Sequence, residues 1–240
     1  FYGTRPDDPN DVFPHENRRE LRGLRVFAAW LNHYLCNSLK TRDFYVTEGG
    51  RSFVKHYLVD FTTALGCGYD LDRRIIPKDK QSGNEYTLTG DWMDTLKTAA
   101  SFGIWERPWM KVDYPSPQYN EIGRFSAEYF HPESWKPFYP NPAFERMFLD
   151  DAFWAAKIIA RFSDEMIRAL VHTGDYSDPA AEIFLADALI ERRDIILRHY
   201  FRQLNPLDQF RVNGATLEFQ NLGMEQNRTD DCVYEYLWYK

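Results

Sequence analysis

The first long periodic segment of the chain lies between Glu16 and His33. Its apolar residues recur at three- and four-residue steps, which is the spacing of one face of an α-helix. That stripe consists of Leu21, Leu24, Phe27, Ala28 and Leu31. We interpret the four arginines that lie largely off the stripe as a solvated helix face: Arg18, Arg19, Arg22 and Arg25. We expect this helix to pack its stripe against helices in the carboxy-terminal part of the chain.

A β-hairpin is predicted directly after this helix. The helical pattern breaks over residues 34–42, and Asp43–Val46 then reads as a short strand. Glu48-Gly49-Gly50 supplies a turn, because glycine tolerates the positive φ of a tight hairpin. Ser52–Val59 is a second strand, rich in β-branched and aromatic residues. The hairpin therefore delivers the carboxylate of Asp60 at its end.

The middle of the chain is less regular. Residues 67–90 are predicted to form a polar loop, and Trp92–Phe102 a short helix that Asp91 can cap. The stretch 104–142 holds seven of the 13 prolines, which remove backbone donors and block helix formation. We predict that it is extended and irregular, and pinned to the surface by its aromatic rings.

Two interpretations of the stretch 104–142 stay open. It is a surface-packed loop if its tryptophans are buried, or a docking surface for a protein partner if they are exposed, since aromatic residues dominate interface cores. The tryptophans that decide are Trp105, Trp109 and Trp135.

Three helices are predicted in the carboxy-terminal third. The first covers Asp151–Arg161. Ser163 caps the second, which runs to about Thr173 and stops at Gly174. Asp178-Pro179 opens the third with an acidic cap and a proline at the first helical position, and this helix runs to Leu204.

The chain is predicted to end in β-structure. Phe210–Phe219 is a hairpin with Asn213-Gly214 at its centre, the preferred dipeptide of a type I′ turn. Val233–Tyr239 reads as a final strand.

These elements predict an α+β fold that is mainly helical and carries small β-hairpins. We divide the 240 residues into an extended segment at 1–15, a mainly helical body at 16–204 that includes 104–142, and a terminal hairpin and strand at 205–240.

Hydrophobic residues make up 44% and charged residues 27%, which is typical of a globular chain and argues against disorder. No apolar run approaches the roughly 20 residues that cross a bilayer, so we expect no transmembrane segment. The net charge of −7 argues against a general nucleic-acid binder.

The cysteines and histidines do not form a recognisable metal motif. The three cysteines, Cys36, Cys67 and Cys232, are odd in number and include no CxxC pair, which argues against a zinc site or a disulfide framework. One disulfide is possible, but three buried thiols are the simpler interpretation. The six histidines form no close pair at metal-ligand spacing.

The segment from the first helix to Asp60 resembles part of a protein-kinase fold. In that fold a helix leads to a catalytic loop, and a short hairpin follows that ends in Asp-Phe-Gly. Here the helix ends in Trp30-Leu31-Asn32-His33, the loop is 34–42, and the hairpin ends in Asp60-Phe61-Thr62. The resemblance implies a kinase-like carboxy-terminal lobe over 16–204. It also implies that Asp60 is a metal ligand and that the loop brings an Asp to the acceptor hydroxyl and an Asn to a second magnesium.

Most of the chain is also similar to a group of uncharacterised bacterial proteins. The shared phrases are Asp7-Asp8-Pro9-Asn10-Asp11, Arg18-Arg19-Glu20-Leu21-Arg22-Gly23-Leu24, Trp30-Leu31-Asn32-His33, His56-Tyr57-Leu58-Val59-Asp60-Phe61, Arg107-Pro108-Trp109, Tyr139-Pro140-Asn141-Pro142-Ala143-Phe144 and Asn205-Pro206-Leu207-Asp208. Proteins of this group often look exported, so the resemblance implies an extracytoplasmic location.

The chain departs from the kinase pattern in its loop. Aligned without gaps from Asn32-His33, Leu35 stands at the position of the catalytic Asp and Lys40 at that of the metal-binding Asn. Leucine has no proton-accepting atom, and lysine repels magnesium. Thr62 replaces the glycine of Asp-Phe-Gly. Two rescues are conceivable: Asn37 as a ligand in a shifted register, or an approach of Asp43.

The amino-terminal lobe of a kinase is not found before the helix, which only 15 residues precede. Either that lobe lies upstream in a longer precursor, or the chain cannot bind nucleotide in the usual way.

We favour a catalytically degenerate kinase-like protein that acts by binding a protein partner, as a subunit of a larger assembly, and we expect no phosphoryl transfer by this chain alone. The alternatives are a metal-dependent phosphotransferase that uses magnesium at Asp60, and a purely structural domain.

Overall fold

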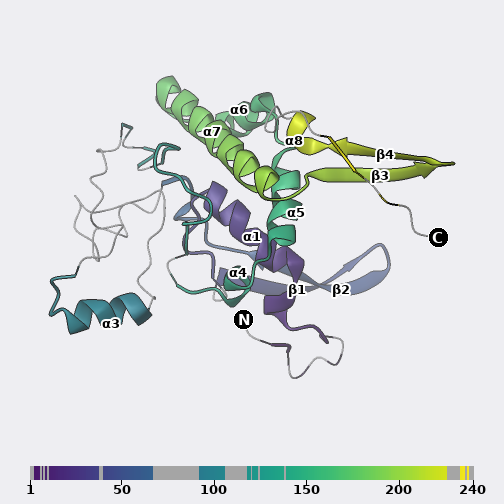
Figure 1. Ribbon diagram of the computed structural model, residues 1–240. Coiled ribbons are helices and arrows are strands. Elements are labelled where there is room, and N and C mark those ends of the chain that lie inside the picture. Colours follow the sequence, from purple (N-terminus) through teal and green to yellow (C-terminus); the bar gives the residue numbers. More distant parts are fainter. Residues whose placement is uncertain are drawn as a thin grey trace.

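The fold is α+β and mainly helical, with two small antiparallel hairpins (Figure 1). The structure is a computed structural model of the chain. The structure describes residues 3–5, 7, 9, 11–37, 40–66, 92–105, 118–119, 121–123, 125–137, 139–225, 233–235 and 237. The fold class predicted from the sequence is therefore confirmed.

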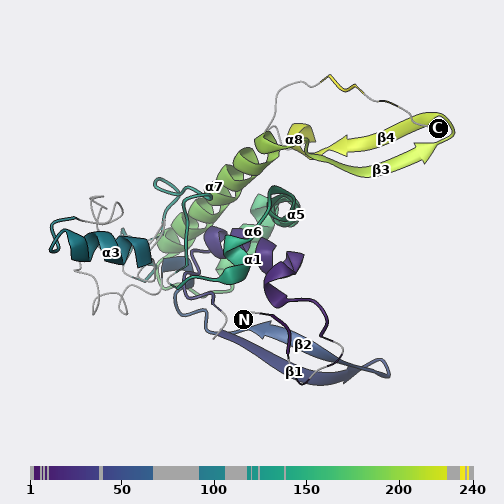
Figure 2. The ribbon, with the colours of Figure 1, turned by 60° about the horizontal axis from the view of Figure 1, so that its bottom comes forward.

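A group of packed helices forms the core. Helix α1 (Arg19–Trp30) follows the short turn η1 (His15–Asn17) and packs against α5 (Leu149–Ile159) and α7 (Pro179–Gln203). The remaining helices of the described residues are α3 (Trp92–Ala100), α4 (Pro142–Glu145), α6 (Asp164–His172), α8 (Leu222–Glu225) and the short turn η3 (Ala64–Gly66). Helix α3 stands apart from this core in both views (Figures 1 and 2).

The most buried residues of α1 are mostly neighbours of the residues in the predicted stripe. Gly23, Val26, Ala29 and Trp30 are fully buried, as is Ala28 of the predicted stripe. The other predicted residues, Leu21, Leu24, Phe27 and Leu31, are half-buried and pack around the margin of the same core. The helix is covered on more sides than a one-stripe pattern implies. The predicted packing of the stripe against the carboxy-terminal helices thus occurs, but the centre of the contact lies elsewhere.

Gly23 lets α1 and α5 approach closely. A Cβ at this position would lie 2.8 Å from Cε3 of Trp154 and 3.2 Å from the carbonyl oxygen of Asp151. Real Cβ atoms do not approach a ring carbon that closely, so an alanine would force the two helices apart.

The substitution Gly23→Ala separates helix propensity from packing. Propensity alone favours alanine in a helix by up to about 1 kcal/mol. We expect the opposite sign, a loss of about 1–3 kcal/mol of unfolding free energy, because the added methyl overpacks the interface. Urea unfolding of Gly23→Ala measures the change. The same substitution in a Trp154→Leu background is the control, where the clash is gone and alanine should be neutral or stabilising. A stabilised single variant would show that the helices can separate without cost.

The arginines predicted to be a solvated face are mostly engaged in structural contacts. Arg22 pairs with Asp151, Arg18 with Asp11, and Arg25 donates to the carbonyl oxygen of Glu133. Arg192 and Arg193, which lie in a charged run of α7, are buried as well. The expectation of a solvated face on α1 is therefore wrong for Arg22, whose acceptor is the buried carboxylate of Asp151, whereas Arg19 is exposed as expected.

The caps predicted for the carboxy-terminal helices are present. The Ser163 side chain accepts a hydrogen bond from the amide of Met166 at the start of α6. The Asp178 side chain accepts one from the amide of Ala180, and Pro179 is the first residue of α7.

Both hairpins form, one of them with a shifted turn. Strands β1 (Thr41–Glu48) and β2 (Arg51–Leu58) are joined by Gly49 and Gly50, both at positive φ as a type I′ turn requires. Strands β3 (Leu207–Asn213) and β4 (Thr216–Asn221) pair Asn213 with Thr216, so the turn residues are Gly214 and Ala215 and not the predicted Asn213-Gly214. With positive φ at Gly214 alone, this turn has the type II′ signature. The two hairpins extend from opposite sides of the helical core (Figure 2).

The final strand predicted at Val233–Tyr239 does not form in the residues described there, 233–235 and 237. Tyr234 instead packs edge-on against Phe219 of β4, with 4.9 Å between the ring centroids, and accepts a hydrogen bond from the side chain of Asn221. Side-chain contacts replace a third strand beside this hairpin.

The described parts of the aromatic, proline-rich stretch are irregular, as predicted, and its rings enter the core. Phe125, Phe130 and Trp135 are buried together with Ile122. Within the described residues, no helix combines the length and apolar character that crossing a bilayer demands.

Candidate functional site

The register of the β1–β2 hairpin brings Lys40 and Asp60 together. Thr41 pairs with Leu58, and one step further the amide of Val59 donates to the carbonyl oxygen of Lys40 at 2.8 Å. Lys40 therefore precedes β1, and Asp60 follows β2, at the same open end of the ladder. Their side chains form an ion pair there, and both are partly exposed.

Asp60 is held as a carboxylate in a fixed orientation. Its backbone has a φ of 67°, a left-handed conformation that aspartate tolerates better than most residues. One oxygen accepts from Lys40 and the other accepts from the hydroxyl of Thr62 at 2.5 Å. These hydrogen bonds, that of Lys40 foremost, lower the pKa of Asp60 to about 2. The group is ionised at any pH at which the protein would work.

His33 lies near the Lys40–Asp60 pair and packs against residues that follow Asp60. Its ring stacks on Phe61 with 4.9 Å between centroids, and its Nδ1 lies 3.3 Å from the hydroxyl oxygen of Thr63. Burial lowers the pKa of His33 against the opposing effect of the Asp60 carboxylate, so the ring is neutral near pH 7. The residue before it, Asn32, accepts a hydrogen bond from the indole nitrogen of Trp135 at 3.0 Å. The loop that carries Lys40 thus starts from a rigid, buried base.

Among the described loop positions, Leu35, Asn37 and Asp43 make contacts other than with Asp60. Leu35 is partly buried against the core, and its amide donates to Thr63. Asn37 donates its side-chain amide to the carbonyl oxygen of Leu35, within its own loop. Asp43 pairs with Arg5 and His56. The structure thus shows Asn37 and Asp43 in contacts with other groups, and the two rescues considered from the sequence stay predictions.

The residues at this position do not fit a magnesium site. Magnesium is held by oxygen ligands, and a lysine ammonium on the carboxylate puts a positive charge where the ion would have to sit. Across the described part of the chain, no three side chains of His, Cys, Asp or Glu converge in a metal-binding group. Asp60 thus has a cationic partner from its own chain.

The tryptophans of the proposed docking surface have different environments. Trp135 is completely buried, so it is a core residue, and its assignment to an interaction surface is wrong. Trp105 is half-buried, with the Lys97 ammonium 5.1 Å from its ring centroid. Trp109 lies outside the described residues. The described tryptophans therefore favour the packed-loop interpretation at 135 and leave it open at 105.

Of the three cysteines, Cys36 lies among the described residues, so the prediction of a buried thiol can be compared with the structure there. Cys36 is a buried free thiol, and burial raises its pKa to about 12, so it is neither a nucleophile nor a ligand at neutral pH. Cys67 and Cys232 lie outside the described residues, as does Asp91, the predicted cap of the helix at 92.

Sequence reasoning missed a cavity near this site that has both apolar and basic lining residues. Its basic lining includes Arg5, His15, Arg18 and His56, which come from the extended N-terminal segment, the start of α1 and the strand β2. No periodicity links these residues, and the shared phrases, which contain Arg18 and His56, did not indicate that the two lie together.

Comparison of the chain with protein-family models, with curated proteins and with solved structures finds no match to any of them. The function is therefore argued from the geometry of the chain itself.

Proposed function

We propose that this chain is a catalytically degenerate kinase-like protein that acts by binding a protein partner, as a subunit of a larger assembly. The observation that carries the proposal is the ion pair of Lys40 with Asp60. In a protein kinase the two corresponding positions are an asparagine and an aspartate, and each holds magnesium. Here the Lys40 ammonium supplies the positive charge that a metal ion would otherwise bring to Asp60.

The loop composition supports the same proposal. Phosphoryl transfer depends on a positioned acceptor and on neutralised phosphate charge, with little covalent chemistry from the protein. Leu35 offers no proton acceptor, and Lys40 offers no oxygen to a metal. The layout of helix, loop and hairpin is kept, while both chemical functions of the loop are missing.

The binding role is supported by exposed aromatic side chains on the β1–β2 hairpin. Phe44, Phe53 and Tyr57 are each at least 40% exposed, and the rings of Phe44 and Tyr57 meet edge-on at 5.4 Å. Exposed aromatic groups of this kind are enriched at protein interfaces. The hairpin projects from the core, where a partner can reach it (Figure 2).

Metal binding at Asp60 tests the proposal. We expect the wild-type chain to show no Asp60-dependent binding of Mn²⁺, used as a spectroscopic substitute for Mg²⁺ and followed by electron paramagnetic resonance. Lys40→Asn replaces the ammonium with an amide oxygen, and we expect Mn²⁺ to bind at least tenfold more tightly. Lys40→Asn combined with Asp60→Ala should lose that gain.

The matched control is Lys55→Asn, which removes a lysine from the exposed pair with Glu48 on the same hairpin. It should not change Mn²⁺ binding. Wild-type binding of Mn²⁺ that Asp60→Ala abolishes, together with magnesium-dependent ATP turnover, would instead establish the phosphotransferase alternative. An Lys40→Asn variant that gains nothing would show that Lys40 is not what excludes the ion.

A further inference from the structure

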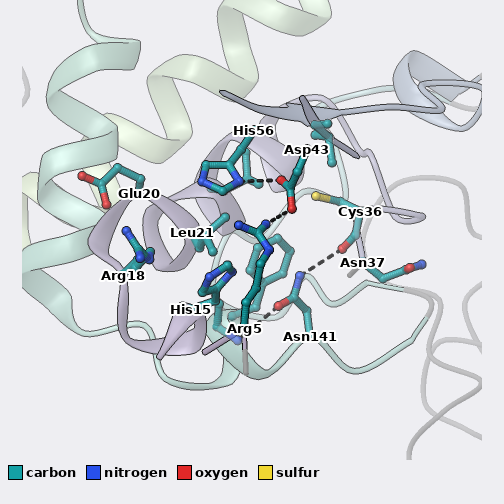
Figure 3. Close-up of a pocket in the computed structure, with 14 residues that line it drawn as sticks. Arg5, His15, Arg18, Glu20, Leu21, Cys36, Asn37, Asp43, His56 and Asn141 are labelled. Carbon is teal, nitrogen blue, oxygen red and sulfur yellow. Dashed lines mark hydrogen bonds and ion pairs between the residues drawn. The ribbon is translucent and has the colours of Figure 1, made fainter. Parts of the chain in front are cut away.

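A cavity of about 280 Å³ lies between the N-terminal segment, α1, the loop before β1, the β1–β2 hairpin and α4 (Figure 3). Four of these segments follow one another between residues 5 and 58, and α4 with the preceding Asn141 closes the cavity from a remote part of the chain. Its volume is near the lower end of the range for small-molecule sites, which is about 300–1,000 Å³. It therefore suits a small ligand.

One wall of the cavity is apolar. It consists of Leu21, Leu24, Leu58, Ala143 and Phe144. Cys36 also lines it, and its thiol stays protonated because burial raises its pKa to about 12. The amides of Asn37 and Asn141 complete this side, and Asn141 is fixed by donating to the carbonyl oxygen of Cys36. This wall can accommodate the apolar body of a ligand.

Basic side chains gather at the other end. Arg5, Arg18 and His56 line the cavity and also a second, open hollow of about 550 Å³ along β1 and β2. These three residues therefore stand at the junction of the two spaces. In Figure 3 the Arg5 side chain extends past His15 toward Asp43 and His56, through the middle of the cavity.

The carboxylates near this junction are already engaged. Asp43 pairs with Arg5 and with Nδ1 of His56, the latter at 2.5 Å. Asp11 is bonded by Nε2 of His15 at 2.7 Å and by Arg18 at 2.8 Å. The backbone amide of Arg5 also donates to Asp11 and contributes most to lowering its pKa to about 2.

His56 has two arginines among its charged neighbours, Arg5 and Arg18. Burial lowers the pKa of His56, and the charges of Arg5 and Arg18 lower it further, against the opposing effect of Asp11. Glu20 lies at the rim, is exposed, and directs its carboxylate away from Arg5 and His56 (Figure 3). The junction therefore presents two guanidinium groups and one imidazole, which can donate hydrogen bonds to an oxyanion.

We propose that this cavity binds a small organic anion, a carboxylate or phosphate ester, whose acidic group lies at Arg5, Arg18 and His56 and whose apolar part packs against Leu21, Leu24 and Phe144. Arginine suits this role because its planar guanidinium binds both kinds of oxyanion in a bidentate manner. The inference concerns a different site from Lys40 and Asp60, and it stands or falls independently of the function proposed above.

The binding should strengthen as the pH falls. The charged and titratable groups that face His56 are Arg5, Arg18, Asp11, Asp43 and His15. Burial also lowers the pKa of His15, so both histidines are neutral near pH 7. Protonation at lower pH adds positive charge beside the bound anion, and the anion in turn favours that protonation.

Titration of the full ¹⁵N-labelled chain with five probes tests the proposal by NMR: octanoate, octyl phosphate, octanol, octylamine and inorganic phosphate. We expect at least one of the two amphiphilic anions to bind at least tenfold more tightly than octanol, octylamine and inorganic phosphate, and more tightly at pH 6 than at pH 7.5. Tighter binding of octanoate would indicate a carboxylate ligand, and tighter binding of octyl phosphate would indicate a phosphate ester. Equal binding of octanol or octylamine, equal binding of inorganic phosphate, or no binding of either anion would overturn the proposal.

Three variants locate the site. Arg18→Gln should weaken binding of the better anion at least tenfold. His56→Gln, a change at a half-exposed hairpin position that does not depend on Arg18 for folding, should weaken it at least threefold and remove most of the pH dependence. Arg168→Gln removes an arginine from the exposed pair with Asp187 on α6 and α7 and should change nothing. Unchanged affinity in His56→Gln and in folded Arg18→Gln would overturn the assignment.

Discussion

Replacing Arg192 with methionine is expected to lower the free energy of unfolding by about 3–5 kcal/mol. The side chain is completely buried in α7. Its guanidinium donates to the carbonyl oxygens of Trp30 at 2.9 Å, Ala29 at 2.6 Å and Ser126 at 2.8 Å. It also lies 3.8 Å from the ring centroid of Phe130, within cation–π range. Methionine fills similar space but leaves all of these acceptors without that donor.

The reason for so large an effect is the position of the acceptors. The carbonyls of Ala29 and Trp30 belong to the last turn of α1, where the helix dipole is negative, and the Ala29 carbonyl also accepts from the amide of Asn32 at 3.1 Å. Arg192 thus donates hydrogen bonds to the carbonyl end of α1 from a helix that lies more than 160 residues later in the sequence. Since α1 leads into Asn32 and His33, this contact also supports the loop that carries Lys40.

Urea unfolding of Arg192→Met, Arg192→Lys and Arg198→Met measures the contribution. Lysine keeps the charge but lacks the planar fork, so we expect it to recover only part of the loss. Arg198 is exposed on the same helix, and its substitution should change stability by less than about 0.5 kcal/mol. Wild-type stability in Arg192→Met would mean that the end of α1 is satisfied without this side chain.

The features that the sequence predicted correctly are those set by neighbouring residues. Ser163 and Asp178-Pro179 bond to amides within three positions, and Gly49-Gly50 adopts positive φ without help from the rest of the fold. The helix boundaries and the first hairpin could therefore be predicted to within a few residues.

The errors arise where tertiary contacts override local preference. Asn213-Gly214 is the preferred type I′ dipeptide, yet the pairing of β3 with β4 places the turn one residue later. An irregularity between Asp208 and Arg211, with Gln209 at a φ of 54°, shifts the register along these strands. A local turn signal cannot reveal a bulge that lies several residues from the turn.

The periodic pattern of polar and apolar residues could predict neither the buried arginines nor the cavities. Arg22, Arg192 and Arg193 look polar at every position of a helical pattern, and their acceptors lie on other segments. The candidate site was only half predictable. The resemblance to a kinase loop aligned Lys40 with a metal-ligand position, but the pairing of Lys40 with Asp60 depends on the hairpin register, and the basic cavity depends on the course of the N-terminal segment.

Replacing Arg22 with methionine is the second substitution with a large expected effect, again a loss of about 3–5 kcal/mol at pH 7. The Asp151 side chain is completely buried, and Arg22 binds it in a bidentate manner, through Nε at 2.5 Å and Nη2 at 2.8 Å. Burial pushes the pKa of Asp151 up, but the hydrogen bonds from Arg22 and the amide of Phe148 outweigh it, and the pKa is lowered overall. Without Arg22 a buried carboxylate at the start of α5 loses its main counter-charge.

The pH dependence of this loss distinguishes a buried charge from lost packing. In the wild type the lowered pKa of Asp151 contributes stability above the pKa of the unfolded state, and this contribution is lost as the pH falls through the folded pKa. In Arg22→Met burial dominates and raises the pKa of Asp151 above its unfolded value, so the variant gains relative stability when the carboxylate protonates. The difference between the two proteins should therefore shrink as the pH is lowered from 7 to about 4.

Chemical denaturation at several pH values measures this for Arg22→Met, Asp151→Asn and the double variant. The double variant should lose less than the sum of the single losses, because each single change leaves one buried charge unpaired. Arg168→Met, which breaks the exposed pair with Asp187, should cost less than about 1 kcal/mol and show no such pH dependence. A loss in Arg22→Met that is equal at all pH values would mean that the methylene packing of Arg22, and not its charge, joins α1 to α5.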